Sequence, residues 1–174
     1  MKSYTNTWST QKITYLALLA ATCVVGRLLF TWLPNIQPMT TVFLLLAFYT
    51  TLSQALFVAL LGLLVTNLYL GMGTWTISQM IAYTVIICFF YCLRQLPLLQ
   101  KHRFLQAILA FLCGLLYGFV VSIMEVFIYQ LPSFWAYYFQ GLSFDLMHGV
   151  GNFGFYLLLA PIFCRLILPK LQKL

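Results

Sequence analysis

The chain has 174 residues, of which 63% are hydrophobic and 6% are charged, and its formal net charge is +7. Because soluble domains carry about 25% charged residues, these few charges could not cover the surface of a soluble fold, and the sequence predicts an integral membrane protein. All but one of the Lys and Arg residues flank apolar runs, where membrane topology accounts for them. This distribution leaves no basic cluster for binding nucleic acid.

The first half of the chain predicts three membrane-spanning helices. The first apolar run, about 13–32, stops before Pro34 and Pro38, which break a helix. The next apolar run would make a single helix of about 48 Å, too long for a hydrocarbon core of about 30 Å. We therefore expect two shorter helices there, at about 39–51 and 53–70, joined by a tight turn.

The second half predicts three further spans, at about 75–93, 104–129 and 143–168. With six spans, all the flanking basic residues fall on one face, which the positive-inside rule makes cytoplasmic. These residues are Lys2, Lys12, Arg94, Lys101, Arg103, Arg165, Lys170 and Lys173. We expect one all-α domain over residues 1–174, a bundle of six transmembrane helices with both termini in the cytoplasm.

The outer connections are then expected at about 33–38, 71–74 and 130–142. The last of these is rich in aromatic residues and carries no charge. We expect its rings to form a lid over a binding site, with Tyr137, Tyr138 and Phe139 as the lid residues. Three tryptophans fall at the same face, as in the aromatic belts of membrane interfaces: Trp32, Trp75 and Trp135.

Arg27 is the one basic residue inside an apolar run. An arginine at the centre of a membrane costs about 2.5–3.5 kcal/mol on insertion scales, so Arg27 needs a partner. The chain has only two acids, Glu125 and Asp145, and both fall on the outer halves of their predicted spans. Two interpretations remain open and can coexist: an ion pair that ties helices together, and an arginine that contacts a ligand in an open cavity.

Other polar side chains also fall on the outer halves of the spans. Asp145, His148 and Asn152 have the spacing i, i+3, i+7 and share one helix face. Because such groups in a membrane either pair or line a wet cavity, the sequence predicts a polar substrate-binding cavity open to the outside. The expected binding residues are Arg27, Asn35, Gln37, Asn67, Trp75, Gln79, Tyr137, Tyr138, Phe139, Asp145, His148 and Asn152.

We expect neither a metal site nor a catalytic centre. The five cysteines lie within apolar stretches, and their spacing matches no known metal site. No nucleophilic serine or cysteine is placed to complete a catalytic group with His148 and Asp145. The GxGxxG match at 149–154 lacks the strand that a dinucleotide site needs, and Gly114 with Gly118 forms a GxxxG pair typical of helix contact.

Small residues on the first helix predict a close helix–helix contact. Ala17 and Ala21 lie one turn apart, with Ala20 beside them, and this spacing lets another helix approach closely. The approaching helix could belong to the same chain or to a partner protein, and both alternatives remain open.

Three segments carry a resemblance to a known family: GRLLF at 26–30, LPNIQPMT at 33–40 and NLYLGMGTWT at 67–76. Together with six predicted helices, the alanine patch and the outward cavity, they resemble the substrate-binding S components of energy-coupling-factor (ECF) transporters. The segments look most like those of the cobalamin-type members. The resemblance covers the whole chain.

The resemblance implies a multi-pass protein of the bacterial cell membrane that binds a vitamin from outside and is not an enzyme. It implies docking through the first helix, at Ala17, Ala20 and Ala21, onto a transmembrane coupling protein that carries two cytoplasmic ATPase subunits. ATP hydrolysis in those partners would topple the S component and deliver the ligand inside, and this chain would hold no cofactor of its own.

The ligand implied first is cobalamin, and other small vitamins or precursors, such as pantothenate or a queuosine precursor, are alternatives. Arg27 could bind the carboxylate of pantothenate. Two other classes remain open. An intramembrane enzyme would need a reactive group of side chains, and a channel subunit would need a polar stripe through the inner half.

Overall fold

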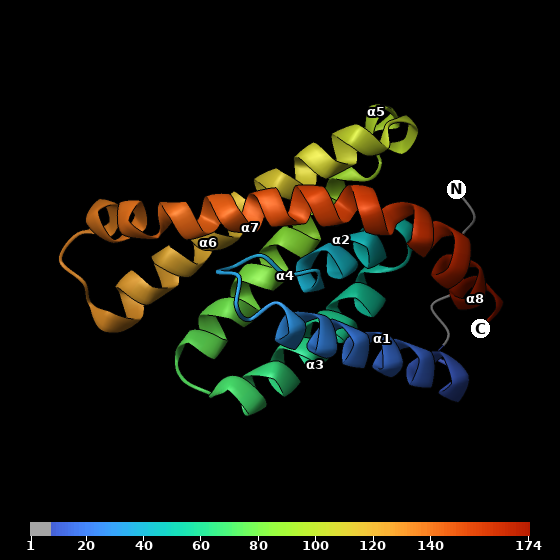
Figure 1. Ribbon diagram of the computed structural model, residues 1–174, viewed down its shortest axis with the longest axis horizontal. Coiled ribbons are helices and arrows are strands. Elements are labelled where there is room, and N and C mark those ends of the chain that lie inside the picture. Colours follow the sequence, from blue (N-terminus) through green and yellow to red (C-terminus); the bar gives the residue numbers. More distant parts are fainter. Residues whose placement is uncertain (1–7) are drawn as a thin grey trace.

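A computed structural model describes residues 8–174 and is helical throughout, with no strand in that range (Figure 1). The elements are α1 (Thr10–Leu29), α2 (Met39–Tyr49), α3 (Leu52–Leu70), α4 (Trp75–Leu93), α5 (Pro97–Lys101), α6 (Arg103–Tyr129), α7 (Phe134–Ile162), a π-helical turn η1 (Phe163–Ile167) and α8 (Leu168–Lys173). Lys2, one of the residues predicted to lie in the cytoplasm, falls outside the described residues.

Within the described range, five helical segments are long and apolar enough to cross a membrane: α1, α3, α4, α6 and the continuous segment Phe134–Lys173. The predicted all-helical class is confirmed, and these apolar helices are compatible with a membrane bundle. α2 is also apolar but has only 11 residues. Its rise of roughly 16 Å is about half the thickness of a hydrocarbon core.

The predicted turn between the second and third spans is confirmed. α2 ends at Tyr49 and α3 begins at Leu52, and the hydroxyl of Thr51 accepts a hydrogen bond from the backbone N–H of Gln54 at 3.4 Å. Arg94 closes the other side of this turn, because its Nη1 donates to the carbonyl oxygens of Ala47 and Thr50. The last turn of a helix leaves such carbonyls without partners, so the buried Arg94 is a cap for α2 and not a solvated charge.

The predicted aromatic loop at 130–142 is wrong. Only residues 130–133 connect α6 to α7, and α7 begins at Phe134. Ser133 starts the helix, since its hydroxyl accepts a hydrogen bond from the N–H of Ala136 at 3.3 Å, as N-cap residues do. The rings of Phe134 and Tyr138, one turn apart, both pack edge-on against Phe119 of α6 at 5.4 Å, which holds this part of the chain helical.

The longest packing contact joins α6 and α7. It depends on paired glycines, because a Cβ added at Gly114 would lie 2.6 Å from the Cα of Gly149. Gly114 of the GxxxG pair and Gly149 of the GxGxxG match are therefore packing elements of this helix pair, while Gly151 faces Ile36 and Gly154 meets open space. α2 lies between the α1–α3 pair and α7 (Figure 1), and its residues Phe43, Leu44, Leu45 and Leu46 are completely buried.

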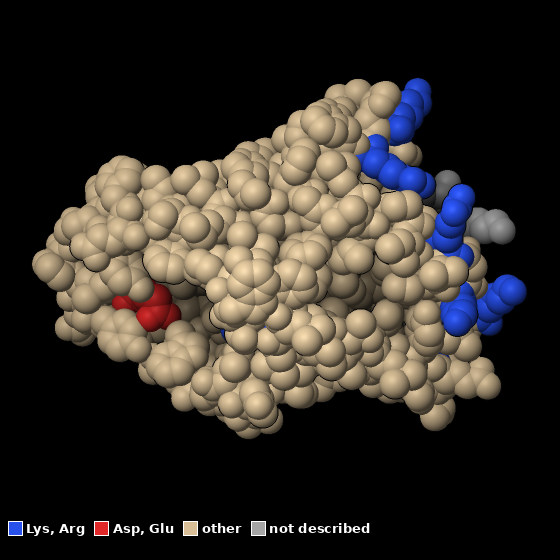
Figure 2. Space-filling view, viewed as in Figure 1, with Lys and Arg blue, Asp and Glu red and all other residues tan. Residues whose placement is uncertain are grey.

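The charged residues are separated along the long axis of the molecule. Figure 2 shows most Lys and Arg side chains gathered at one end, while the acidic side chains lie near the other end, and Arg27 lies apart from the basic end, beside Asn35 and Gln37. The two ends of the described chain meet at the basic end, where the hydroxyl of Ser9 donates to the backbone carbonyl of Leu174 at 3.3 Å. The bundle therefore has one basic end, where the two ends of the described chain meet, and an opposite end that holds the two acids.

Candidate functional site

A polar cavity of about 360 Å³ opens between the outer parts of α4, α6 and α7 and the connection between α1 and α2. Its polar lining side chains are Asn35, Gln79, Ser122, Tyr137, Gln140 and Asp145. Four of these belong to the predicted binding set: Asn35, Gln79, Tyr137 and Asp145. Tyr117, Phe144 and Val121 supply apolar and aromatic surface. The structure thus brings together residues from four distant parts of the sequence in one cavity of ligand size.

Sequence reasoning missed Ser122 and Gln140. Ser122 lies three residues before Glu125 on α6, so helical spacing places the two on one face and was a usable signal. Gln140 fell in the segment expected to be a loop, and its position on α7, five residues before Asp145, became meaningful only once that segment proved helical.

The two acids are buried at this end of the molecule, each with 6% of its surface exposed. Oε1 of Glu125 and Oδ2 of Asp145 are buried and have no hydrogen-bond partner in residues 8–174. Figure 2 shows acidic side-chain atoms beside a hollow in the surface, surrounded by uncharged residues. Burying a carboxylate without a partner is costly, and Asp145 lines the polar cavity, so this cavity can receive a group that compensates Asp145.

Arg27 is held by neutral groups, and its hydrogen bonds correct the expectation of an ion pair with an acid. Its Nη1 donates to Oγ1 of Thr66 at 2.7 Å and to Oδ1 of Asn67 at 3.1 Å. Asn67 in turn donates from Nδ2 to Oε1 of Gln79 at 2.8 Å and to Oγ1 of Thr76 at 3.1 Å. The network ties α1, α3 and α4 together, and it ends at Gln79, which lines the polar cavity.

Arg27 also lines a second, smaller hollow of about 190 Å³ beneath the connection between α1 and α2. Asn35 and Gln37 lie in its wall. Asn35 therefore borders both hollows, and its Nδ2 donates to the carbonyl oxygen of Phe144 on α7 at 3.2 Å. This contact lets the connection form one side of the polar cavity.

His148 and Asn152 share a face with Asp145, as predicted, but they lie deeper in the bundle. Nε2 of the fully buried His148 is 2.9 Å from Oγ1 of Thr40 on α2. The Tyr117 ring packs edge-on against His148, with 4.9 Å between ring centroids. Nδ2 of Asn152 donates to the backbone carbonyl of Ala110 at 3.4 Å. These side chains support the cavity from below, with Tyr117 between them and the cavity.

The predicted aromatic binding residues divide into two groups. Tyr137 lines the polar cavity. Trp75 and Phe139 are exposed, with 45% and 63% of their surface accessible, and Tyr138 stacks on Phe134 with ring centroids 5.8 Å apart. The exposed rings suit the membrane interface, where Trp and other aromatic residues concentrate.

The three alanines of α1 also divide. Ala20 is buried, with 1% of its surface exposed. It packs against α3, because a Cβ added at Gly62 would lie 3.7 Å from the carbonyl oxygen of Ala20. Ala17 is half-buried and Ala21 is exposed. Contact within the chain therefore accounts for Ala20, while Ala21 remains available to a second helix.

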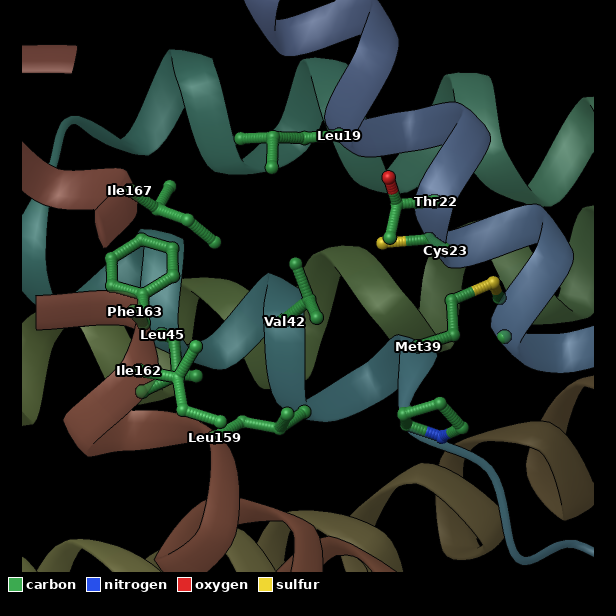
Figure 3. Close-up of a pocket in the computed structure, with 12 residues that line it drawn as sticks. Leu19, Thr22, Cys23, Met39, Val42, Leu45, Leu159, Ile162, Phe163 and Ile167 are labelled. Atoms are coloured by element: carbon green, nitrogen blue, oxygen red, sulfur yellow. The ribbon is translucent and has the colours of Figure 1, made fainter. Parts of the chain in front are cut away.

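A third cavity, of about 300 Å³ and mostly apolar, lies between α1, α2 and the end of α7 (Figure 3). Its wall consists of side chains such as Leu19, Met39, Val42 and Phe163. The one hydroxyl in the wall belongs to Thr22, and it donates to the carbonyl of Leu18 at 2.9 Å. Because this cavity offers a ligand so little polar recognition, the polar cavity at the acidic end is the stronger candidate for binding a small molecule.

The part of the chain that the structure describes contains no group of three or more side chains able to hold a metal ion.

Fold and cavity together define a helical membrane protein with a polar, ligand-sized cavity at the end opposite its basic residues. No protein-family model, no curated protein and no solved structure matches this chain.

Proposed function

We propose that this chain is the substrate-binding S component of an ECF-type importer, which captures a small vitamin or vitamin precursor from outside the cell. The observation that carries the proposal is the polar cavity in an apolar helical bundle, at the end opposite the cluster of basic residues. Its wall combines neutral amides, tyrosines and one acid, Asp145, as expected for a site that binds a polar organic molecule and releases it unchanged.

The proposed topology has six spans, with the short α2 as the second, and both termini in the cytoplasm. The clustering of Lys and Arg at one end supports this orientation (Figure 2), because basic residues remain on the cytoplasmic side. The contact between Ser9 and Leu174 keeps both ends of the described chain at that end. The cavity then faces the outside of a bacterial cell membrane.

The size of the cavity bears on the ligand. Sites for small molecules have volumes of about 300–1,000 Å³, and this cavity lies near the lower limit. Of the ligands expected from the sequence, this favours a small vitamin or precursor, such as pantothenate or a queuosine precursor. Cobalamin would require the outer ends of α6 and α7 to move away from α4.

The proposed transport cycle requires partner proteins. The exposed Ala21 and half-buried Ala17 of α1 would meet a transmembrane coupling protein, and two ATPase subunits attached to it would hydrolyse ATP. The S component would then topple in the membrane and present its cavity to the cytoplasm. An intramembrane enzyme is less well supported, because His148 bonds Thr40 beneath the cavity and so is not placed as a base beside a bound substrate.

Isothermal calorimetry on the purified chain in detergent, without ATP, tests the proposal. The panel contains cobalamin, pantothenate, a queuosine precursor, thiamine, riboflavin, biotin, pyridoxamine and pyridoxal. We expect one compound to bind at a ratio of one to one with a dissociation constant in the micromolar range or below. If no compound binds to protein that remains monodisperse and helical, the proposed function is wrong.

A further inference from the structure

The acid in the cavity wall, Asp145, gives a clue to the charge of the ligand. Glu125 and Asp145 are the only acids in the chain, and each has a buried oxygen without a partner in the described range. Both lie at the end opposite the cluster of Lys and Arg side chains (Figure 2), and Arg27 is the one basic residue in this half of the described chain. An uncompensated buried carboxylate lowers stability, so a ligand that compensates it would bind favourably.

Arg27 does not compensate the buried acids in the structure. Its Nη1 is bonded to Thr66 and Asn67, and it lines the smaller hollow beneath the connection between α1 and α2. The cavity that Asp145 lines contains no Lys or Arg side chain among the described residues. An anionic ligand placed there would meet a carboxylate and no cation.

The rest of the lining suits a planar ring with N–H donors. Tyr117, Tyr137 and Phe144 present aromatic surface, and aromatic faces attract cations as well as other rings. Asn35 uses its Nδ2 to bond Phe144, which leaves its Oδ1 as an acceptor. The cavity thus offers acceptors on several sides and aromatic faces between them.

We infer that the ligand of this cavity is a small nitrogen heterocycle that presents a protonated amine, or an edge with several N–H donors, to Asp145. This inference rests on the proposed function, which makes the cavity a substrate site, and it adds the substrate class. A charge-assisted hydrogen bond from such a ligand would satisfy the buried Oδ2 of Asp145.

The test compares closely related probes on the purified chain. Pyridoxamine and pyridoxal share a ring and differ at one substituent, an amine against an aldehyde. Thiamine and an aminomethyl queuosine precursor extend the cationic set, and pantothenate and biotin form the anionic set. We expect the tightest probe to be cationic, and we expect pyridoxamine to bind more tightly than pyridoxal.

Two isosteric variants identify the groups responsible. Asp145→Asn removes the negative charge from the cavity wall with little change in shape and should weaken the tightest probe by about tenfold or more, as for the loss of a charge-assisted hydrogen bond. Glu125→Gln removes the other buried charge, which does not line the cavity, and should weaken the probe less. Gln79→Glu adds a carboxylate to the same cavity and should strengthen binding of a cation. Gly154→Ala is the control on α7, because a Cβ at Gly154 meets open space.

The outcomes separate the two proposals. If an anionic or neutral probe binds tightest, or if a cationic probe binds equally well to wild type and to folded Asp145→Asn and Glu125→Gln, the inferred ligand class is wrong while the substrate-binding function stands. If no probe of the whole panel binds to wild type, both proposals fail. The comparison of probes on wild type remains decisive even where a variant does not fold.

Discussion

Gly118 of α6 and Asp145 of α7 are in direct contact, because a Cβ built at Gly118 would overlap the Asp145 carboxylate. The absence of a side chain at Gly118 is therefore what allows Asp145 to lie in the wall of the cavity. Gly114, one turn earlier on α6, instead faces the backbone of Gly149. Two glycines of one helix face thus have different tasks, one at the cavity and one in the packing of the helix pair.

Gly118→Ala should abolish or strongly weaken ligand binding while the fold remains. The added methyl group meets the end of a flexible side chain, so Asp145 can move at little cost but leaves its position in the cavity. Gly114→Ala meets backbone and should lower the thermal midpoint, since overpacking costs typically 1–3 kcal/mol. Thermal unfolding and calorimetry on both variants, with Gly154→Ala as the control, check the prediction. Normal binding by Gly118→Ala would contradict the role of Asp145.

Asn67→Ala should destabilise the protein more than a typical polar substitution. It removes partners of Arg27, Thr76 and Gln79 at once, and hydrogen bonds between membrane helices contribute about 1–2 kcal/mol in model peptides. We expect a lower midpoint of thermal unfolding in detergent. Thr22→Ala, which removes one exposed hydroxyl bonded within its own helix, is the control and should change the midpoint little. Equal effects would contradict the network.

Arg94→Ala should loosen α2. The guanidinium bonds the carbonyls of Ala47 and Thr50 and lies 3.7 Å from the centre of the Tyr91 ring. Hydrogen bonds to charged groups contribute about 1.5–3 kcal/mol, so a loss of this order is expected, and Arg94→Lys should recover only part because lysine lacks the planar fork. Chemical denaturation in mixed micelles measures the free energy of unfolding of each variant. The exposed Arg165→Ala is the control, and a similar loss there would refute the capping role.

Ala21→Leu should block assembly with the coupling protein and leave ligand binding intact, since Ala21 is exposed on α1. Ala20→Leu, in contrast, should destabilise the chain itself, because Ala20 is buried against α3. Co-purification with the coupling protein and the ATPases, together with calorimetry, separates the two effects. Leu18→Ala, at another exposed position of α1, is the control. Unchanged assembly by folded Ala21→Leu would remove the docking role.

Cysteine labelling tests the proposed orientation. Met72 lies exposed between α3 and α4, and Lys101 lies exposed at the end of α5. A membrane-impermeant maleimide should label Met72→Cys in intact cells and Lys101→Cys only after lysis. Wild type sets the background from the native cysteines. The reverse pattern would place the cavity in the cytoplasm and exclude capture from outside.

The sequence predicted the helix ends well where a local signal was strong. Pro34 and Pro38 interrupt the chain between α1 and α2 as expected, and the expected fourth span at 75–93 coincides with α4. The aromatic segment after Pro132 was misassigned because its rings, without charges, looked like a lid. The N-capping Ser133 and the one-turn spacing of Phe134 and Tyr138 were the signals for a helix.

The candidate site was predicted only in part, for a geometric reason. Helical spacing shows that Asp145, His148 and Asn152 share a face, but not how deep each one lies. His148 and Asn152 are about 4.5 and 10 Å further along the axis than Asp145, which is enough to move them from the cavity wall into the core. Likewise, composition could not show that Arg27 bonds Thr66 and Asn67, because those contacts depend on how α1 and α3 pack.

The shortness of α2 has a consequence for the lipid around the protein. A segment that rises roughly 16 Å is too short to cross a hydrocarbon core of about 30 Å, so we expect part of the irregular stretch before it to lie at membrane depth. Bare peptide groups at that depth are tolerated only against protein or water. We therefore expect the outer leaflet to be locally thinned and hydrated above α2, so that a polar molecule could approach Asn35 without crossing the hydrocarbon core.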